Sequence, residues 1–195
     1  MNFLAHLYLS SHNKNLMIGN FIADEVKGKK HEAFPTEIAQ GILMHRFIDS
    51  YTDTHPNVLE CTKMLRPHIS KFSAVALDVF FDYFLAKDWQ KHHTDSLPNF
   101  TQNAYQLILL NADILPEKSK YIFKYMSSQD WLLNYAKIEG IKKALSGMAS
   151  RSKYGSILDG SEKYLLKYEH ELQLHFDIFF DAIKSEIKLS GWYYK

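Results

Sequence analysis

The sequence predicts an all-α fold, with residues 1–195 forming a single-domain helical bundle. Apolar residues recur at helical spacing along almost the whole chain, and the alternation of apolar and polar residues typical of strands is absent. The chain is 46% hydrophobic and contains 13 Phe, 12 Tyr and 3 Trp, enough for a substantial core. We find no repeat, low-complexity tract or Gly/Ser linker that would divide it.

Turn signals define the first five predicted helices. A short helix covers residues 2–10, and a second covers 15–26 and is closed by Gly28. The third begins near Pro35, a residue suited to a first helical turn, and ends before Pro56. Helix 57–65 should be stopped by Pro67, and an apolar helix follows over residues 73–89.

The second half of the chain continues the same pattern. Helices are predicted over residues 98–111 and 116–126, each of which starts at a proline. A longer helix over 129–151 should break near Gly140, and the last predicted helix covers 161–189.

Composition excludes several classes of function. The net charge of +1 gives no global electrostatic footprint for nucleic acid. Cys61 stands alone, so an internal disulfide and a cysteine-rich zinc site are excluded, and a reducing, cytoplasmic setting fits. The first residues lack a basic leader, and no run of about 18 apolar residues predicts a membrane span. The sequence leaves the oligomeric state open.

The third predicted helix carries the strongest functional signal. Its apolar stripe starts at Ile38 and Ile42 and continues by helical steps onto His45, Asp49 and then Thr52 or Asp53. An inward carboxylate costs several kcal/mol unless a cation, a metal or hydrogen-bond donors meet it. The alternative is structural, with Arg46 pairing with Asp49 and Asp53 capping the helix that follows.

Two aspartates also interrupt the helix over 73–89. Asp78 and Asp82 share a face with Phe81 and Leu85 in a segment that is apolar all round, as buried helices are. We therefore favour buried carboxylates with compensating partners over a solvated face. Asp24 and His6 are weaker signals, because one is compatible with a solvated helix end and the other with a hydrogen-bonded core histidine.

Together these positions predict a metal site. Two imidazoles and up to five carboxylates point inward from four helices, and this mixed set suits Mn²⁺ or Mg²⁺ better than Zn²⁺ or Fe²⁺. The chain contains no glycine-rich phosphate loop, no His-Glu-x-x-His motif and no nucleophile elbow. Water activated by a metal is therefore the predicted nucleophile.

The ordered fragments resemble the acyl carrier protein phosphodiesterases over essentially the whole chain. The matching segments are 2–7, Gly19-Asn20 leading to Asp24, 44–53, Leu77-Asp78 with Asp82, and Gly147-Met148-Ala149-Ser150-Arg151. The resemblance implies a manganese-dependent hydrolase that removes 4′-phosphopantetheine from the serine of holo-acyl carrier protein, and a helical fold related to the HD phosphohydrolases. Two departures stand out: no His-Asp dipeptide occurs, and Tyr83 follows Asp82 where the family leads us to expect histidine.

On this interpretation each candidate has a role. One or two Mn²⁺ ions would be held by Asp24, His45, Asp49 and Asp82, and Arg46 would brace the phosphoryl oxygens. His6 or Asp53 would pass a proton to the leaving serine. Basic residues would meet the acidic carrier protein, although each is individually compatible with an ordinary solvated side chain; they are Lys27, Lys29, Lys30 and Arg151.

Two other functions compete with this one. A metal phosphohydrolase of the same helical class, acting on a nucleotide or another small phosphodiester, could use the same inward ligands. A helical binding module without enzymatic activity could instead pair its carboxylates with Arg46, Arg66 or Arg151. Comparing turnover of holo-carrier protein with turnover of nucleotides or small phosphodiesters would distinguish the first alternative from the carrier-protein hydrolase. The metal content of the purified protein would distinguish the second.

Overall fold

A computed structural model describes residues 1–151 and 153–192, and within these ranges all regular secondary structure is helical, without a strand, which confirms the all-α prediction. The first half consists of α1 (Phe3–Leu9), α2 (Lys14–Ile22), α3 (Thr36–Thr54), α4 (Pro56–Ile69), α5 (Ser73–Lys87) and α6 (Trp89–His92). The second half consists of α7 (Leu97–Leu110), α8 (Glu117–Ser128), α9 (Trp131–Asn134), α10 (Ile138–Arg151), α11 (Glu162–Lys167) and α12 (Glu169–Leu189). Short 3₁₀ turns connect several of them, among them η1 (Ala23–Glu25) and η2 (Gly28–Ala33).

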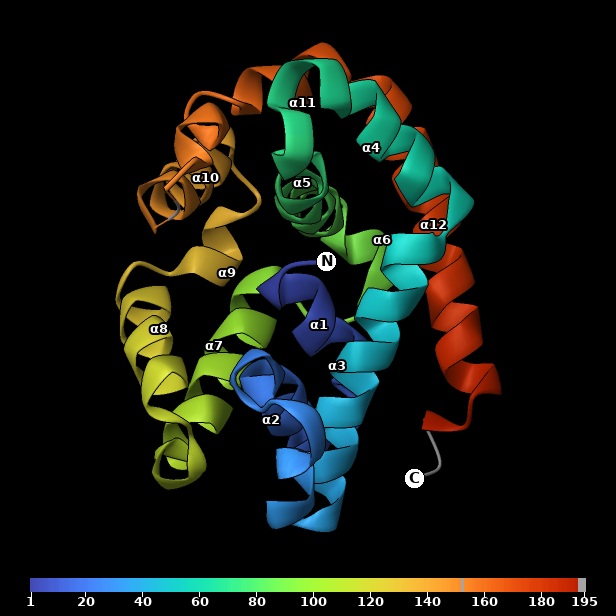
Figure 1. Ribbon diagram of the computed structural model, residues 1–195. Helices are drawn as coiled ribbons and strands as arrows, with labels where there is room; N and C mark the ends of the chain where they lie inside the picture. The colour runs from blue at the N-terminus through green and yellow to red at the C-terminus, as the bar shows by residue number, and fades with distance from the viewer. Residues whose placement is uncertain (152, 193–195) are drawn as a thin grey trace.

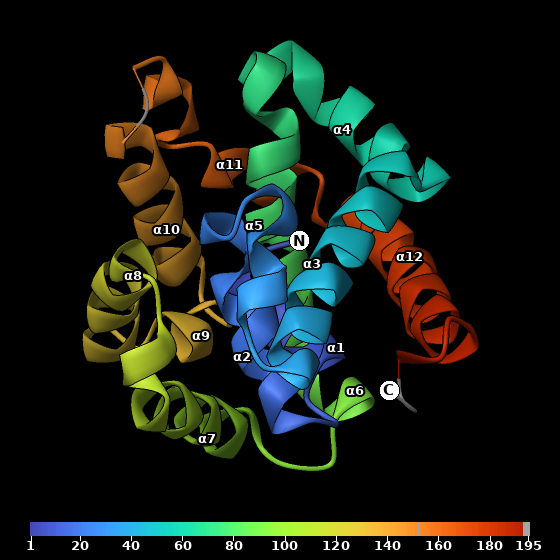
Figure 2. The same ribbon diagram turned by 60° about the horizontal axis from the view of Figure 1, so that its bottom comes forward.

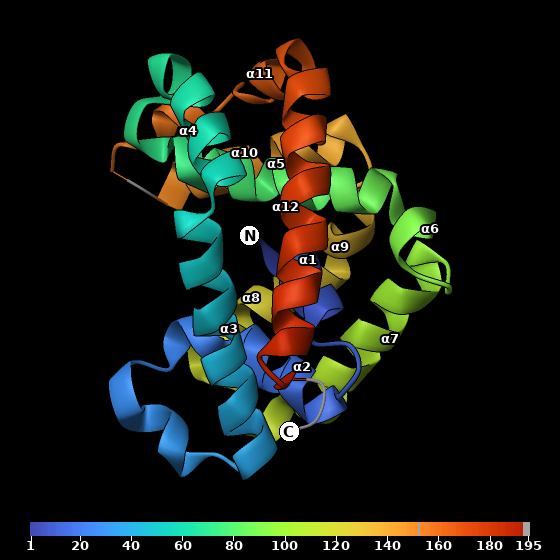
Figure 3. The same ribbon diagram turned by 90° about the vertical axis from the view of Figure 1, so that its right-hand side faces the viewer.

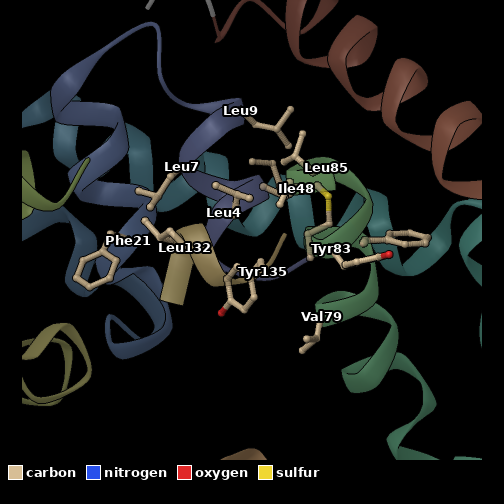
Figure 4. Close-up of a cluster of buried hydrophobic side chains, with 14 of the residues drawn as sticks. Leu4, Leu7, Leu9, Phe21, Ile48, Val79, Tyr83, Leu85, Leu132 and Tyr135 are labelled. Carbon is tan, nitrogen blue, oxygen red and sulfur yellow. The ribbon is translucent and has the colours of Figure 1, made fainter. Parts of the chain in front are cut away.

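Helix α5 lies at the centre of the molecule and contacts α1, α4, α10 and α12 (Figure 1). Its burial follows from its sequence, because Phe80, Phe81, Phe84 and Leu85 cover more than one face and all are fully buried. Figure 3 shows α12 running across the outside of α5. Around α5 the core includes side chains of α1, α3 and α9, as the close-up in Figure 4 shows.

Helices α2 and α3 pack with their backbones in direct contact (Figure 2). A Cβ added to Gly19 would lie 2.0 Å from the carbonyl oxygen of Ile38, and one added to Gly41 would lie 2.3 Å from that of Leu16. Only glycine permits this approach at either position. The crossing places the second half of α2 beside the middle of α3, where the polar residues of both helices lie.

Several predicted boundaries differ from the structure. The helix predicted over 15–26 ends at Ile22, and the one predicted over 73–89 divides at Asp88 into α5 and α6. Helix α4 continues through Pro67 to Ile69, although proline has no N–H and the helix loses one i→i−4 hydrogen bond there. The predicted helix 129–151 divides into α9 and α10 ahead of Gly140, and the predicted helix 161–189 divides at Tyr168 into α11 and α12. Among the described residues, the helices are too short or too polar to cross a bilayer.

Candidate metal centre

Two histidines and one aspartate from different parts of the chain converge beside the α2–α3 crossing. The Nε2 atoms of His6 on α1 and His45 on α3 each lie 3.1 Å from a different carboxylate oxygen of Asp49. One ligand atom from each residue can be chosen so that all three lie within 4.8 Å of one another. The imidazole rings stack with centroids 4.0 Å apart, so both nitrogens face the carboxylate from the same side.

Asn20 sets the orientation of both imidazoles. Its side-chain nitrogen donates to the backbone carbonyl of His6 at 3.1 Å, and its Oδ1 lies 2.9 Å from Nδ1 of His6 and 2.9 Å from Nδ1 of His45. A carbonyl oxygen only accepts, so both Nδ1 atoms must carry the proton. When the rings are neutral, each Nε2 therefore presents its lone pair toward Asp49, which is the state in which imidazole binds a metal.

This donor set fits a divalent cation. Nε2 of His6 is buried and has no hydrogen-bond partner among the described residues, although Asp49 lies near it. Two imidazole lone pairs directed at a carboxylate repel it unless a proton or a cation lies between them. The structure thus contains an unsatisfied buried nitrogen at the point where a cation would satisfy all three groups.

The charges of the cluster are strongly coupled. Burial, together with the neighbouring His45, lowers the pKa of His6 to about 4. Burial also acts to lower the pKa of His45, but Asp24 and Asp49 together outweigh it and raise this pKa to about 9. Burial acts to raise the pKa of Asp49, but the two histidines hold it well below its usual range.

A cavity of about 320 Å³ opens beside these residues and carries three further carboxylates. Asp24 lies in η1 with Oδ1 3.5 Å from Nε2 of His45, and this histidine lowers the pKa of its carboxyl. Asp53, one turn after Asp49, is exposed and lines the cavity. Asp78 also lines it, with Oδ1 3.0 Å from the amino nitrogen of Met1.

Asp82 lies outside this group. It is fully buried, and its two oxygens accept hydrogen bonds from the backbone N–H groups of Leu4 and Ala5 at 2.8 and 3.1 Å. These are first-turn amides of α1, which a helix cannot satisfy by itself. Asp82 therefore anchors the start of the helix that carries His6, and the structure does not bring it to the cluster with which the sequence interpretation had grouped it.

Arg46 and Tyr83 also lie away from the cavity. The guanidinium of Arg46 donates to the carbonyl oxygens of Val26 and Gly28 at 2.7 and 2.9 Å, so it holds the chain segment that follows Asp24. The hydroxyl of Tyr83 donates to Glu169 at 3.0 Å, and its ring belongs to the core (Figure 4). The position at which the family resemblance suggests histidine thus faces α12.

The predicted basic residues lie at hollows adjoining the cavity. Lys27 lines a small hollow together with Asp24, and Lys29 and Lys30 are exposed on η2. Arg151 is exposed at the end of α10 and lines a larger hollow on another side of the cavity. Phe3 lines all three of these spaces.

Sequence reasoning gave no role to Asn20, and it treated His6 as a proton carrier. The signal for Asn20 was present, because an asparagine in the middle of the apolar stretch 16–22 needs a partner when it is buried. The sequence does not show that two histidines 39 positions apart would share that partner.

Comparison with known proteins gives the family. The family model described as acyl carrier protein phosphodiesterase matches residues 1–183. The chain belongs to the acyl carrier protein phosphodiesterase family. This family consists of enzymes, and the likeness extends over nearly the full length of individual members.

Three relatives illustrate the likeness, each named acyl carrier protein phosphodiesterase. The protein of Serratia proteamaculans is 34% identical over 96% of this chain and 98% of its own length. That of Yersinia enterocolitica is 34% identical over 95% and 97%, and that of Yersinia pestis 38% identical over 83% and 84%. No solved structure matches the chain, so its relation to the HD phosphohydrolases stays a prediction.

Proposed function

We propose that this protein hydrolyses the phosphodiester between 4′-phosphopantetheine and the serine of holo-acyl carrier protein, in a metal-dependent reaction. The observation that carries the proposal is the convergence of Nε2 of His6, Nε2 of His45 and the carboxylate of Asp49 beside an open cavity. Membership of the family gives the substrate class.

The cation would be held by His6, His45 and Asp49, with Asp24 close enough to His45 to complete the set. A mixture of nitrogen and oxygen ligands fits Mn²⁺, with Mg²⁺ as the second choice. When bound, such a cation lowers the pKa of a coordinated water and neutralises charge on the phosphodiester oxygens.

The protein's own residues do the remaining work. Asn20 holds both imidazoles in the tautomer that binds a cation, and Arg46 fixes the segment after Asp24. Asp53 lines the cavity one helical turn from Asp49 and is our candidate for the residue that passes a proton to the leaving serine oxygen.

Basic side chains flank the cavity where an acidic carrier protein would approach. We assign this role to Lys27, Lys29 and Lys30 on one side and Arg151 on the other. Attraction between oppositely charged exposed surfaces is screened by salt. The KM for holo-carrier protein should therefore rise with ionic strength while kcat changes little. The substrate would place the enzyme in the cytoplasm and in the metabolism of fatty acids.

The deciding experiment is intact-mass spectrometry of holo-acyl carrier protein after incubation with the enzyme, in Mn²⁺ and separately in EDTA. We expect the carrier to lose the mass of phosphopantetheine in Mn²⁺ and to remain intact in EDTA. His45→Ala should abolish the mass loss, whereas His170→Ala, at an exposed position of α12, should leave it unchanged. An intact carrier in the presence of folded, Mn²⁺-loaded enzyme, together with hydrolysis of nucleotides or small phosphodiesters, would contradict the proposal.

A further inference from the structure

A second and larger hollow adjoins the metal centre. It has a volume of about 740 Å³ and lies among α8, α9 and the second half of α10, the three helices that Figure 2 shows together on one side of α2. This volume is within the range of small-molecule sites in proteins. Four aromatic side chains of these helices and their connections line it, Tyr121, Tyr125, Trp131 and Tyr135, and so do the cationic side chains of Lys143 and Arg151.

The hollow is adjacent to the cavity at the metal centre. Phe3 and Met148 line both spaces, so they stand at the boundary between them. A ligand whose phosphate lies at His6 and Asp49 would therefore extend past these two side chains into the larger space. The smaller cavity, of about 320 Å³, has less than half the volume of the hollow, so the hollow offers most of the space for the rest of the ligand.

Gly147 gives an independent reason to regard this space as a binding site. It lies in the interior of α10 and lines the hollow, and a Cβ built on it meets no atom within 4 Å. Glycine in a helix interior costs about 1 kcal/mol relative to alanine. At Gly19 and Gly41 the close contact with the facing helix requires glycine. At Gly147 neither a close neighbour nor the backbone conformation requires it. The open space itself is what glycine preserves here.

The walls suit a long and amphipathic ligand, because they combine aromatic rings with polar side chains. The pantetheine arm of a carrier protein has two amides, a hydroxyl and a pair of methyl groups, and it carries no charge beyond its phosphate. Aromatic walls would cover the methyl groups and methylenes, and the side-chain amides of Gln129 and Asn134 also line the hollow, where they could pair with amides of the arm.

We propose that the hollow among α8, α9 and α10 receives the pantetheine arm of the carrier protein while the phosphodiester lies at the metal centre. This inference rests on the function proposed above and adds the place of the arm to it. It also gives the segment Gly147 to Arg151 a role, since Gly147, Met148, Ser150 and Arg151 all line the hollow.

A test should fill the hollow without touching the metal centre. Gly147→Trp would place an indole in the open space, and Gly147→Leu would fill part of it. Gly147→Ala is the matched control, because it restores helix propensity and adds only one methyl group. We expect Gly147→Ala to melt no lower than the parent, since an added Cβ meets no atom within 4 Å. Circular dichroism of all three variants checks that each is folded before binding is compared.

The readout is affinity for holo- and apo-carrier protein, measured by calorimetry in EDTA with carrier mass checked afterwards. The parent should bind the holo form more tightly than the apo form. Gly147→Trp should lose about tenfold in affinity for the holo form and stay within about twofold for the apo form. Gly147→Leu should lose less, and Gly147→Ala almost nothing.

Two results would overturn the inference. The first is equal binding of both forms by the parent. The second is an equal loss for both forms in Gly147→Trp, which would mean that the hollow meets the carrier's protein surface. Hydrolysis is measured separately with the parent in Mn²⁺. If the parent hydrolyses holo-carrier protein but gives either of these binding results, the proposed position of the arm is wrong and the proposed function stands. If the parent does not hydrolyse it, the proposed function itself is wrong.

Discussion

Asp49 on α3 and Asp82 on α5 show the same pattern in the sequence but have different surroundings in the structure. Each is an aspartate on an apolar helical face, yet Asp49 faces two imidazole nitrogens beside a cavity and Asp82 is saturated by two backbone amides. The amides that face Asp82 are backbone N–H groups of α1, and they cannot serve as ligands for a cation. The nitrogens that face Asp49 can give up any proton they carry, so a cation can bind between them and the carboxylate. A buried carboxylate is therefore a functional candidate only when its partners can also bind something else.

The largest expected difference between the two aspartates is in turnover. Asp49→Asn should lower kcat for holo-carrier protein by about 10³-fold, the scale on which removal of one electrostatic group affects catalysis. Asp82→Asn should lose much less at temperatures where it is folded. Rates from carrier mass spectra would measure both, with Asp181→Asn on α12 as the matched surface control. A larger loss in Asp82→Asn than in Asp49→Asn would reverse the comparison.

The stability of the protein should show the opposite order. Asp82→Ala leaves two first-turn amides of α1 buried without an acceptor, so its free energy of unfolding should fall by about 2–4 kcal/mol. Asp49→Ala should change it less in EDTA, because Asp49 is nearly half exposed and its histidines can release their protons. Urea unfolding followed by circular dichroism measures both values. Equal destabilisation would mean that the cluster, too, is held together for structural reasons.

A substitution of Asn20 tests whether this residue orients the two imidazoles for cation binding. Asn20→Leu keeps the volume of the side chain but removes the acceptor that both Nδ1 atoms share. Affinity for Mn²⁺ should fall about 10- to 100-fold, as is usual when the partner of a metal-binding histidine is lost. Titration calorimetry gives the affinity, and Asn57→Leu, which removes the partner of His175 instead, is the matched control. Unchanged Mn²⁺ affinity in Asn20→Leu would contradict the role of Asn20.

The last comparison concerns the dependence of stability on pH. Burial raises the pKa of Asp82 to about 7 in the folded protein, compared with 3.8 for the free group. Between these values the folded protein keeps a proton that the unfolded chain has released, so this contribution to stability falls as the pH rises and is constant above about 7. The stability of the parent relative to Asp82→Asn should therefore decrease from pH 4 to pH 7 in EDTA. A difference that increases over this interval would mean that the two amides outweigh burial.

The sequence predicted the fold class and the order of the helices because periodic apolar residues and their caps are local signals. It also predicted that polar groups of α3 point inward, and His45 and Asp49 lie together as one-turn spacing requires. The union of His6 with Asn20 and His45 depends on the close contact at Gly19 and Gly41, which only the assembled helices show. For the same reason the sequence could not distinguish Asp49 from Asp82, since their partners come from other segments of the chain.

The hydrogen bonds from Leu4 and Ala5 to Asp82 have a consequence for the order in which the site is completed. All atoms of the His6, His45 and Asp49 cluster belong to the first 49 residues, so during synthesis they leave the ribosome before residue 82 does. A nascent chain that has reached only the end of α3 holds every cation ligand of the cluster, yet the first turn of α1 still lacks its acceptor. The ligands are thus translated early, and the anchor that fixes one of them arrives some thirty residues later.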